Sequence, residues 1–336
     1  MIAAAGLRTH IWNNNLKSIA LLAGFPVLVL AIVFAAALVW SGYADAPAKT
    51  GASADAMGPA LDLTLRAFPF VMIGVAVWFV IAWLGYQAMI DAATGARKVS
   101  RTEEPELYNL LENLTISRGM PMPSLRIIET DALNAYASGL SEQKAVITVT
   151  RGLMTTLNTE ELEAVLAHEL SHVIHRDVRL LVIAVIFVGI ISFTVEIAAR
   201  GLFHGSLARA GGGRRGRSGN AGAILLVAVL IVALAYALAF VIRFALSRSR
   251  EYMADAGAVE LTKNPDAMIS ALEKISGRCE IKSAPEEVRQ MFIENKPKAS
   301  FAGLFATHPP IEKRIEALEV YAGGRRRPRD TSIPSV

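Results

Sequence analysis

Cysteine is almost absent from this sequence of 336 residues, because Cys279 is the only one. A single cysteine excludes an internal disulfide framework. Charged residues are also few, at 19% of the chain, and the arginine clusters at 214–217, 248–250 and 325–327 have no aromatic residues between them. Basic clusters that flank apolar runs favour contact with lipid headgroups, or a solvated tail, over nucleic-acid binding. With 53% hydrophobic residues, much of the chain is expected to lie in lipid.

Long stretches without any charge mark the expected membrane segments. Each of three such stretches exceeds the ~20 residues that cross a hydrocarbon core about 30 Å thick, which predicts spans at 18–40, 67–90 and 221–243. A fourth apolar segment, expected at about 180–197, is marginal for a span. Only sixteen residues, 180–195, separate Arg179 from Glu196, which is about 24 Å of helix. The first span lacks a small-residue cleavage site, so we expect a retained anchor rather than a signal peptide.

Basic residues set the expected orientation. They precede the first span and follow the second, and the positive-inside rule therefore places both ends of this hairpin in the cytoplasm (Arg8, Lys17, Arg97, Lys98 and Arg101). The loop at 200–220 carries five arginines on the side that two further full spans would place outside. Either the segment at 180–197 does not cross the membrane or the earlier charges outweigh this loop, and the sequence leaves both readings open.

The remaining segments predict a mainly α-helical fold with a small β-sheet. Leucines at helical spacing predict a helix over 103–118, and β-branched runs bounded by proline and glycine predict strands at 125–129 and 144–150. A further short strand is expected between them, at 133–139. Asn158 and Glu161 have the spacing of a capping box, so a helix is expected to start there and to run to about Asp177. A last amphipathic helix is expected over 312–321, followed by a disordered tail from Gly323.

Within the helix that follows Asn158 lies the pentapeptide His168-Glu169-Leu170-Ser171-His172. Two histidines four residues apart lie about 40° apart around a helix, so both imidazoles can reach one zinc ion. Glu169, beside the first histidine, is placed to activate a water molecule at such a metal. The pattern therefore predicts zinc-dependent hydrolysis.

A third protein ligand is expected downstream, because catalytic zinc usually takes three and leaves a fourth position open. Glu251 is the best candidate. Glu251 and Asp255 are four residues apart on a helical stretch, so one carboxylate can bind the metal while the other holds a ligating imidazole by its second nitrogen. Charged residues around the pentapeptide, Glu160 and Asp177 among them, argue against a site inside a membrane span.

Four features follow one another along the chain. They are the HExxH pentapeptide, an apolar hairpin, Arg250-Glu-Tyr-Met-Ala-Asp255, and Thr307-His-Pro-Pro310 with Arg314 close behind. In this order they resemble the HtpX-like membrane zinc metalloproteases, relatives of the type 1 CAAX prenyl proteases. The resemblance covers residues from about 100 to 322, together with the preceding hairpin.

This resemblance implies roles for particular residues. It implies one Zn²⁺ per chain on His168, His172 and Glu251, with Glu169 as general base and Asp255 holding a ligand. It further implies that five residues approach the substrate: His308 and Arg314 as substrate or oxyanion contacts, and Asn134, Tyr136 and Ala137 on an edge strand to which an extended peptide adds.

Together these predictions describe an integral membrane protein with a zincin-like domain interrupted by a transmembrane hairpin. Its parts are expected at 1–95 (first hairpin), 96–178 (first part of the domain), 179–245 (second hairpin), 246–322 (second part) and 323–336 (tail). The protein is expected to cross the cytoplasmic membrane several times, with its protease domain facing the cytoplasm. It is expected to hydrolyse misfolded or damaged membrane proteins. Its partners would be polypeptides and the bilayer, not nucleic acid, and no oligomeric state is indicated. A CAAX-type processing protease and a non-catalytic chaperone or adaptor on the same scaffold are the alternatives.

Overall fold

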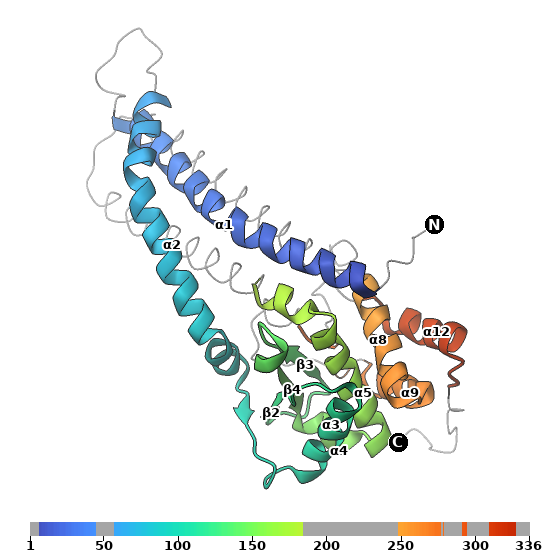
Figure 1. The fold of residues 1–336 in the computed structure, drawn as a ribbon. Helices are drawn as coiled ribbons and strands as arrows, with labels where there is room; N and C mark the ends of the chain where they lie inside the picture. Colours follow the sequence, from blue (N-terminus) through green and yellow to red (C-terminus); the bar gives the residue numbers. More distant parts are fainter. Residues whose placement is uncertain are drawn as a thin grey trace, which may run out of the picture. The chain divides into compact units, whose positions relative to one another are not determined.

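The computed structural model describes residues 7–44, 57–183, 248–276, 278, 291–293 and 309–326. The chain forms two compact units, one made of residues 1–17, 87–182 and 243–336, the other of 18–86 and 183–242. The described elements are mostly helices with one small mixed sheet, which confirms the predicted fold class (Figure 1). The second hairpin predicted at 179–245, with its basic loop, and the tail beyond 326 fall almost wholly outside the described residues.

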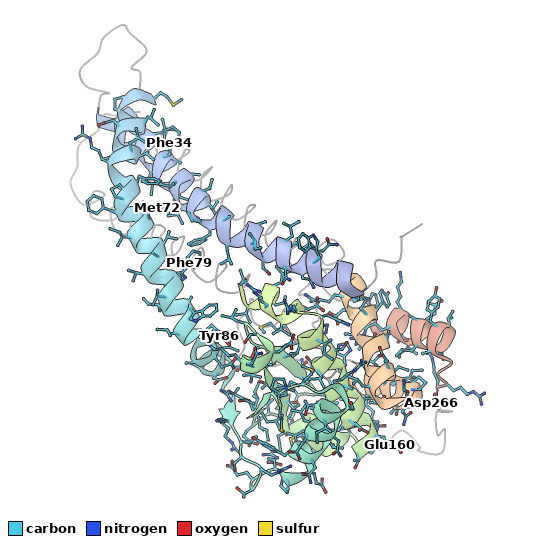
Figure 2. The ribbon with its side chains drawn as sticks, in the orientation of Figure 1. Phe34, Met72, Phe79, Tyr86, Glu160 and Asp266 are labelled. Carbon is cyan, nitrogen blue, oxygen red and sulfur yellow. The ribbon has the colours of Figure 1, made fainter. Side chains whose placement is uncertain are left out.

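The second unit contains the greater part of two long helices, α1 (Leu7–Ala44) and α2 (Met57–Thr94). Within the described part of the chain, Trp12–Leu38 and Met57–Thr94 are long and apolar enough to cross a membrane, with hydropathies of 2.7 and 2.3. Large apolar side chains along them are exposed, Phe70 at 75% and Leu84 at 78% (Figure 2). Such a surface suits lipid rather than water. The spans predicted at 18–40 and 67–90 lie within these helices.

The sheet of the first unit has the strand order β1-β2-β4-β3. Its strands are β1 (Arg97–Lys98), β2 (Ser124–Ile128), β3 (Ala135–Ser138) and β4 (Val146–Thr150). The strands β2 and β4 pair in parallel, whereas β1 with β2 and β3 with β4 pair antiparallel. The three predicted strands, at 125–129, 133–139 and 144–150, are therefore present, and the short β1 is an addition to them. Because β3 is at one end of the order, it is an edge strand.

The main helices in the described part of this unit are α3 (Pro105–Arg118), α4 (Arg151–Thr156), α5 (Thr159–Ile174), α8 (Arg248–Thr262), α9 (Pro265–Ile275) and α12 (Ile311–Ala322). The helix α5 is central, because it packs against α3, α8, α9 and β3 (Figure 1). It ends at Ile174, earlier than predicted, since Arg176 takes a left-handed conformation with φ 59° before helix resumes at 177–183. This break separates His172 from Asp177 by a turn rather than by continuous helix.

Candidate metal centre

The pentapeptide is carried by α5, whose start is fixed by a capping box. Asn158 Oδ1 accepts a hydrogen bond from Glu161 N, and Glu161 Oε2 accepts one from Asn158 N, both at 2.9 Å. Glu161 also accepts bonds from Ser270 and Lys274 of α9, each at 2.6 Å. Burial raises the pKa of Glu161, but these hydrogen bonds outweigh it and hold the pKa below its ordinary value. The predicted capping box is thus confirmed, and it also fastens α5 to α9.

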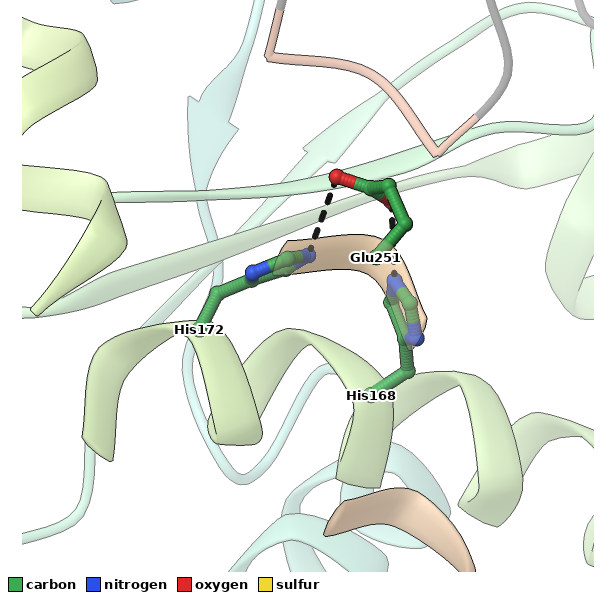
Figure 3. A group of neighbouring side chains, drawn as sticks. All are labelled: His168, His172 and Glu251. Carbon is green, nitrogen blue, oxygen red and sulfur yellow. Dashed lines mark ion pairs between the residues drawn. The ribbon is translucent and has the colours of Figure 1, made fainter. Parts of the chain in front are cut away.

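Two helices bring three metal-ligating side chains together, His168 and His172 from α5 and Glu251 from the first turn of α8 (Figure 3). One ligand atom from each lies within 4.8 Å of the others. Glu251 Oε2 is 3.7 Å from His168 Nε2, and Glu251 Oε1 is 3.9 Å from His172 Nε2. The imidazole rings are nearly perpendicular, at 89°, and all three side chains are largely or fully buried.

These donors fit a zinc ion. Two imidazoles and one carboxylate form a known ligand set of catalytic zinc, which leaves a fourth position open. Ligand atoms about 2.0–2.1 Å from a tetrahedral ion lie ~3.3 Å apart. The separations of 3.7 and 3.9 Å involve different oxygens of Glu251, and one ligand atom from each of the three residues lies within 4.8 Å of the others, so side-chain rotation has to bring these atoms closer around one ion.

Glycine at position 257 allows α8 to approach α5 closely enough to present Glu251. A Cβ atom at Gly257 would overlap Ser171 Oγ and would lie 2.9 Å from Ser171 Cβ. Ser171 is 1% exposed and belongs to the pentapeptide, so it has little room to yield. The distance between the two helices, and hence the position of Glu251, depends on this glycine.

Gly257→Ala is therefore expected to lower both the melting temperature and the zinc content of the purified protein. Replacing glycine by alanine within a helix ordinarily stabilises it by about 1 kcal/mol. A loss of stability in Gly257→Ala would therefore show that the added Cβ atom clashes with Ser171. The double variant S171G/G257A removes the opposing side chain and should recover both properties. A melting temperature in Gly257→Ala equal to or above that of the wild type would contradict this account.

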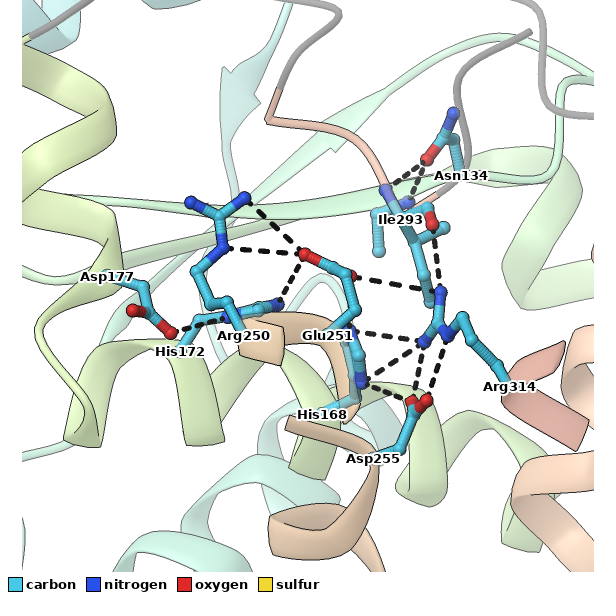
Figure 4. A network of polar contacts seen from close by, with 10 residues as sticks. Asn134, His168, His172, Asp177, Arg250, Glu251, Asp255, Ile293 and Arg314 are labelled. Carbon is cyan, nitrogen blue, oxygen red and sulfur yellow. Dashed lines mark hydrogen bonds and ion pairs between the residues drawn. The ribbon is translucent and has the colours of Figure 1, made fainter. Parts of the chain in front are cut away.

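A carboxylate and an arginine hold the first histidine. Asp255 Oδ1 lies 3.0 Å from His168 Nδ1, and Arg314 donates to Asp255 from Nε at 2.9 Å and from Nη2 at 2.6 Å (Figure 4). Burial and Arg314 lower the pKa of His168, but Asp255 and Glu251 outweigh them and raise it to about 9. With Nδ1 engaged by Asp255, the Nε2 atom of His168 is directed at Glu251.

The second histidine has a corresponding partner that the sequence did not reveal. Asp177 Oδ2 lies 3.1 Å from His172 Nδ1, and Asp177 Oδ1 accepts a hydrogen bond from Asn14 Nδ2 at 2.7 Å. The sequence indicates Asp177 only as a charge near the pentapeptide and gives no role to Asn14. Because Asn14 and Asp177 are 163 residues apart, only the tertiary structure brings them together. The one local signal is the polar run Asn13-Asn14-Asn15 just before an apolar span.

Glu169 borders a small cavity beside the three candidate ligands. The cavity holds about 10 Å³, roughly the room of one water molecule, and is lined also by Ala137, His172 and Glu251. Glu169 is 2% exposed, and burial raises the pKa of its carboxyl above the ordinary value. A carboxylate with a raised pKa is a stronger base. Met291, Phe292 and Ile293 are among the other residues that line this cavity.

The remaining predicted site residues occupy different places. Ala137 lines the cavity, whereas Asn134 Oδ1 accepts a hydrogen bond from Ile293 N at 3.1 Å. Tyr136 is 1% exposed, and its hydroxyl lies 3.1 Å from that of Thr94. Arg314, also 1% exposed, is engaged by Asp255 behind His168. His308 lies outside the described residues.

Comparison with known proteins assigns this chain to a family. The profile of peptidase family M48 matches residues 101–322, about two thirds of the chain. The chain belongs to this family. The predicted resemblance is confirmed, and so are the metalloprotease activity and the zincin-like fold class that it implied.

Relatives in the M48 family match this chain over nearly its whole length. A protein named "Protease HtpX homolog" from Bacteroides fragilis is 44% identical over 94% of this chain and 99% of its own length. Another of the same name from Listeria monocytogenes is 37% identical over 91% and 97%. Among solved structures, the crystal structure of S. mikatae Ste24p has a TM-score of 0.43 and 17% identity, and covers 92% of this chain and 66% of that one. The protein is thus a membrane-associated M48 metalloprotease that acts on polypeptides.

Proposed function

We propose that the protein is a zinc-dependent endopeptidase of the cytoplasmic membrane that degrades misfolded or damaged membrane proteins. One Zn²⁺ per chain would be held by His168, His172 and Glu251. The observation that carries the proposal is the buried convergence of these three side chains within 4.8 Å, beside Glu169.

Glu169 carries the proton in the proposed hydrolysis. When bound, zinc polarises the scissile carbonyl and lowers the pKa of a water molecule towards neutrality. The Glu169 carboxylate takes a proton from water as the oxygen adds to the carbonyl carbon, and then delivers that proton to the amide nitrogen as the carbon–nitrogen bond breaks. The raised pKa of Glu169 supports this, because it strengthens the base and keeps proton return to the nitrogen accessible.

Asp255 and Arg314 orient His168 in this proposal. The two hydrogen bonds from Arg314 fix the Asp255 carboxylate, and that carboxylate fixes the His168 ring through Nδ1. This position favours an orienting role for Arg314 over the oxyanion contact that the resemblance also suggested. His308 is the other candidate for that contact.

The outer edge of β3 is the proposed substrate strand. Asn134 O accepts from Thr150 N on the β4 side, whereas Ala135 O accepts from Ile293 N on the opposite side. Because the backbone alternates along a strand, the N–H and C=O groups of Ala137 point to that outer side as well. Ala137 also lines the cavity beside Glu169. An extended peptide pairing with Ala137 would therefore lie beside the general base, with Ile293 displaced where the peptide runs past Ala135.

Membrane proteins are the proposed substrates because the site is tied to membrane helices. The α1 helix continues from its polar first turns into an apolar span, and Arg97 and Lys98 directly follow the α2 span. Basic residues at this point favour a cytoplasmic domain, by the positive-inside rule. We retain the division into hairpins at 1–95 and 179–245 and domain parts at 96–178 and 246–322 as part of this proposal.

The substrate class can be tested by comparing membrane fractions of cells that make the wild type or Glu169→Gln. Since Glu169→Gln keeps the metal ligands and β3, it should bind substrates without cleaving them. Integral membrane proteins are expected to accumulate in these fractions and to co-purify with the variant after crosslinking. Enrichment of soluble proteins alone would contradict the proposed substrate class while leaving the peptidase activity intact.

A further inference from the structure

We propose that Asn14, in the N-terminal helix, is a positioning residue for the metal centre and acts on His172 through Asp177. The inference rests on the proposed function, in which His172 holds the zinc. Asn14 lies outside residues 101–322, which match the family profile, so it would extend the centre to a segment before the peptidase domain.

The contacts form a continuous buried chain. Asn14 Nδ2 donates to Asp177 Oδ1 at 2.7 Å, and Asp177 Oδ2 lies 3.1 Å from His172 Nδ1. Asn14 is 4% exposed and Asp177 0%, so water competes little for either contact. One carboxylate oxygen thus accepts from the Asn14 amide, and the other faces the His172 imidazole. The contact between Asp177 and His172 is drawn in Figure 4.

Asn14 also binds the turn that presents Asp177. Its Nδ2 atom donates to His175 O at 3.2 Å, within the break between α5 and the helix at 177–183. Arg176 takes its left-handed conformation in this break, with φ 59°. One amide group therefore contacts both the carboxylate and the backbone that carries it.

The contacts of His168 follow the same pattern as those of His172. There Asp255 engages Nδ1, and a side-chain N–H donor, Arg314, fixes Asp255. Around His172, Asp177 takes the place of Asp255, and Asn14 takes the place of Arg314. For both histidines, the buried carboxylate at Nδ1 selects the imidazole tautomer that leaves Nε2 free for the metal. The side-chain N–H donor keeps that carboxylate in place.

The test is the zinc dissociation constant of the full-length protein in detergent, measured by competition with a chromophoric chelator. Loss of an outer-shell partner typically weakens metal binding by about 10–100-fold. We expect Asn14→Ala to weaken zinc binding by about tenfold, and Asn14→Asp, which keeps the volume but replaces the donor with a like charge, to weaken it further. Asn13→Ala is the matched control, because Asn13 is the exposed neighbour on the same helix, and it should bind as the wild type does.

A double-mutant cycle with Asp177→Ala separates positioning from general stability. If Asn14 acts through Asp177, adding Asn14→Ala to Asp177→Ala should change zinc affinity little, whereas independent effects would add. Co²⁺-substituted protein gives a second readout, because Asn14→Ala should shift the visible absorption bands that report ligand geometry and Asn13→Ala should not.

His172→Ala is the reference that separates this inference from the proposed function. Wild-type zinc affinity in Asn14→Ala and Asn14→Asp, or additive effects in the cycle, would overturn the role of Asn14 while His172→Ala still loses zinc. Retention of wild-type affinity by His172→Ala would instead overturn the proposed metal centre itself.

Discussion

Glu169→Gln is expected to lower casein hydrolysis by about 10²–10⁴-fold while zinc content stays at that of the wild type. The amide keeps the shape of the side chain but cannot accept a proton from water, whereas the three candidate ligands are untouched. The measurement pairs cleavage rates with metal analysis on the same purified samples. Glu160→Gln, an exposed glutamate at the start of the same helix, is the control and should cleave normally (Figure 2).

Equal cleavage by Glu169→Gln and the wild type would rule out the proposed base. Loss of zinc along with activity would show that Glu169 acts in metal binding rather than in proton transfer. The same experiment addresses the alternative of a non-catalytic adaptor, which predicts no metal-dependent cleavage by either protein.

Glu251→Ala is expected to abolish both zinc binding and hydrolysis. With one of three ligands removed, zinc affinity should fall by more than the roughly 100-fold upper range seen for outer-shell partners. Glu251→Gln should have a similar effect without a cavity, which separates the missing charge from a packing defect. Zinc content and a chelator-competition titration provide the measurement.

Glu260→Ala is the matched control for this prediction, because Glu260 lies on the same helix and pairs with Arg118 near the surface. Surface pairs contribute about 0–1 kcal/mol, so this variant should keep its zinc and its activity. Stoichiometric zinc and full activity in Glu251→Ala would show that another residue completes the coordination.

Local patterns were sufficient to predict much of the fold and the core of the site. The capping box at Asn158 and Glu161 depends on a spacing of three residues, and the pentapeptide depends on helical periodicity, so both can be read along the chain. The β-branched runs predict two of the four strands, and the segment between them predicts a third. Such features depend on neighbours in sequence.

The features that escaped prediction depend on distant contacts. Asn14 meets Asp177 across 163 residues, and Ile293 meets Asn134 across 159. The left-handed turn at Arg176 interrupts a helix in which no glycine or proline signals a stop. In the sequence, Gly257 is only a residue of low helix propensity. The structure shows its role, because Ser171 of α5 lies against it and leaves no room for a Cβ atom. These contacts position the residues around the candidate metal ligands and are not part of the HExxH pentapeptide itself.

X-ray diffraction at the zinc absorption edge, from crystals of the full-length protein, would locate the metal and its three ligands directly. We predict one anomalous peak per chain, about 2.0–2.2 Å from His168 Nε2, His172 Nε2 and a carboxylate oxygen of Glu251, with Asp255 and Asp177 on the Nδ1 atoms. A peak held by other side chains, or a zinc ion bound by both histidines with Glu251 turned away, would contradict the account.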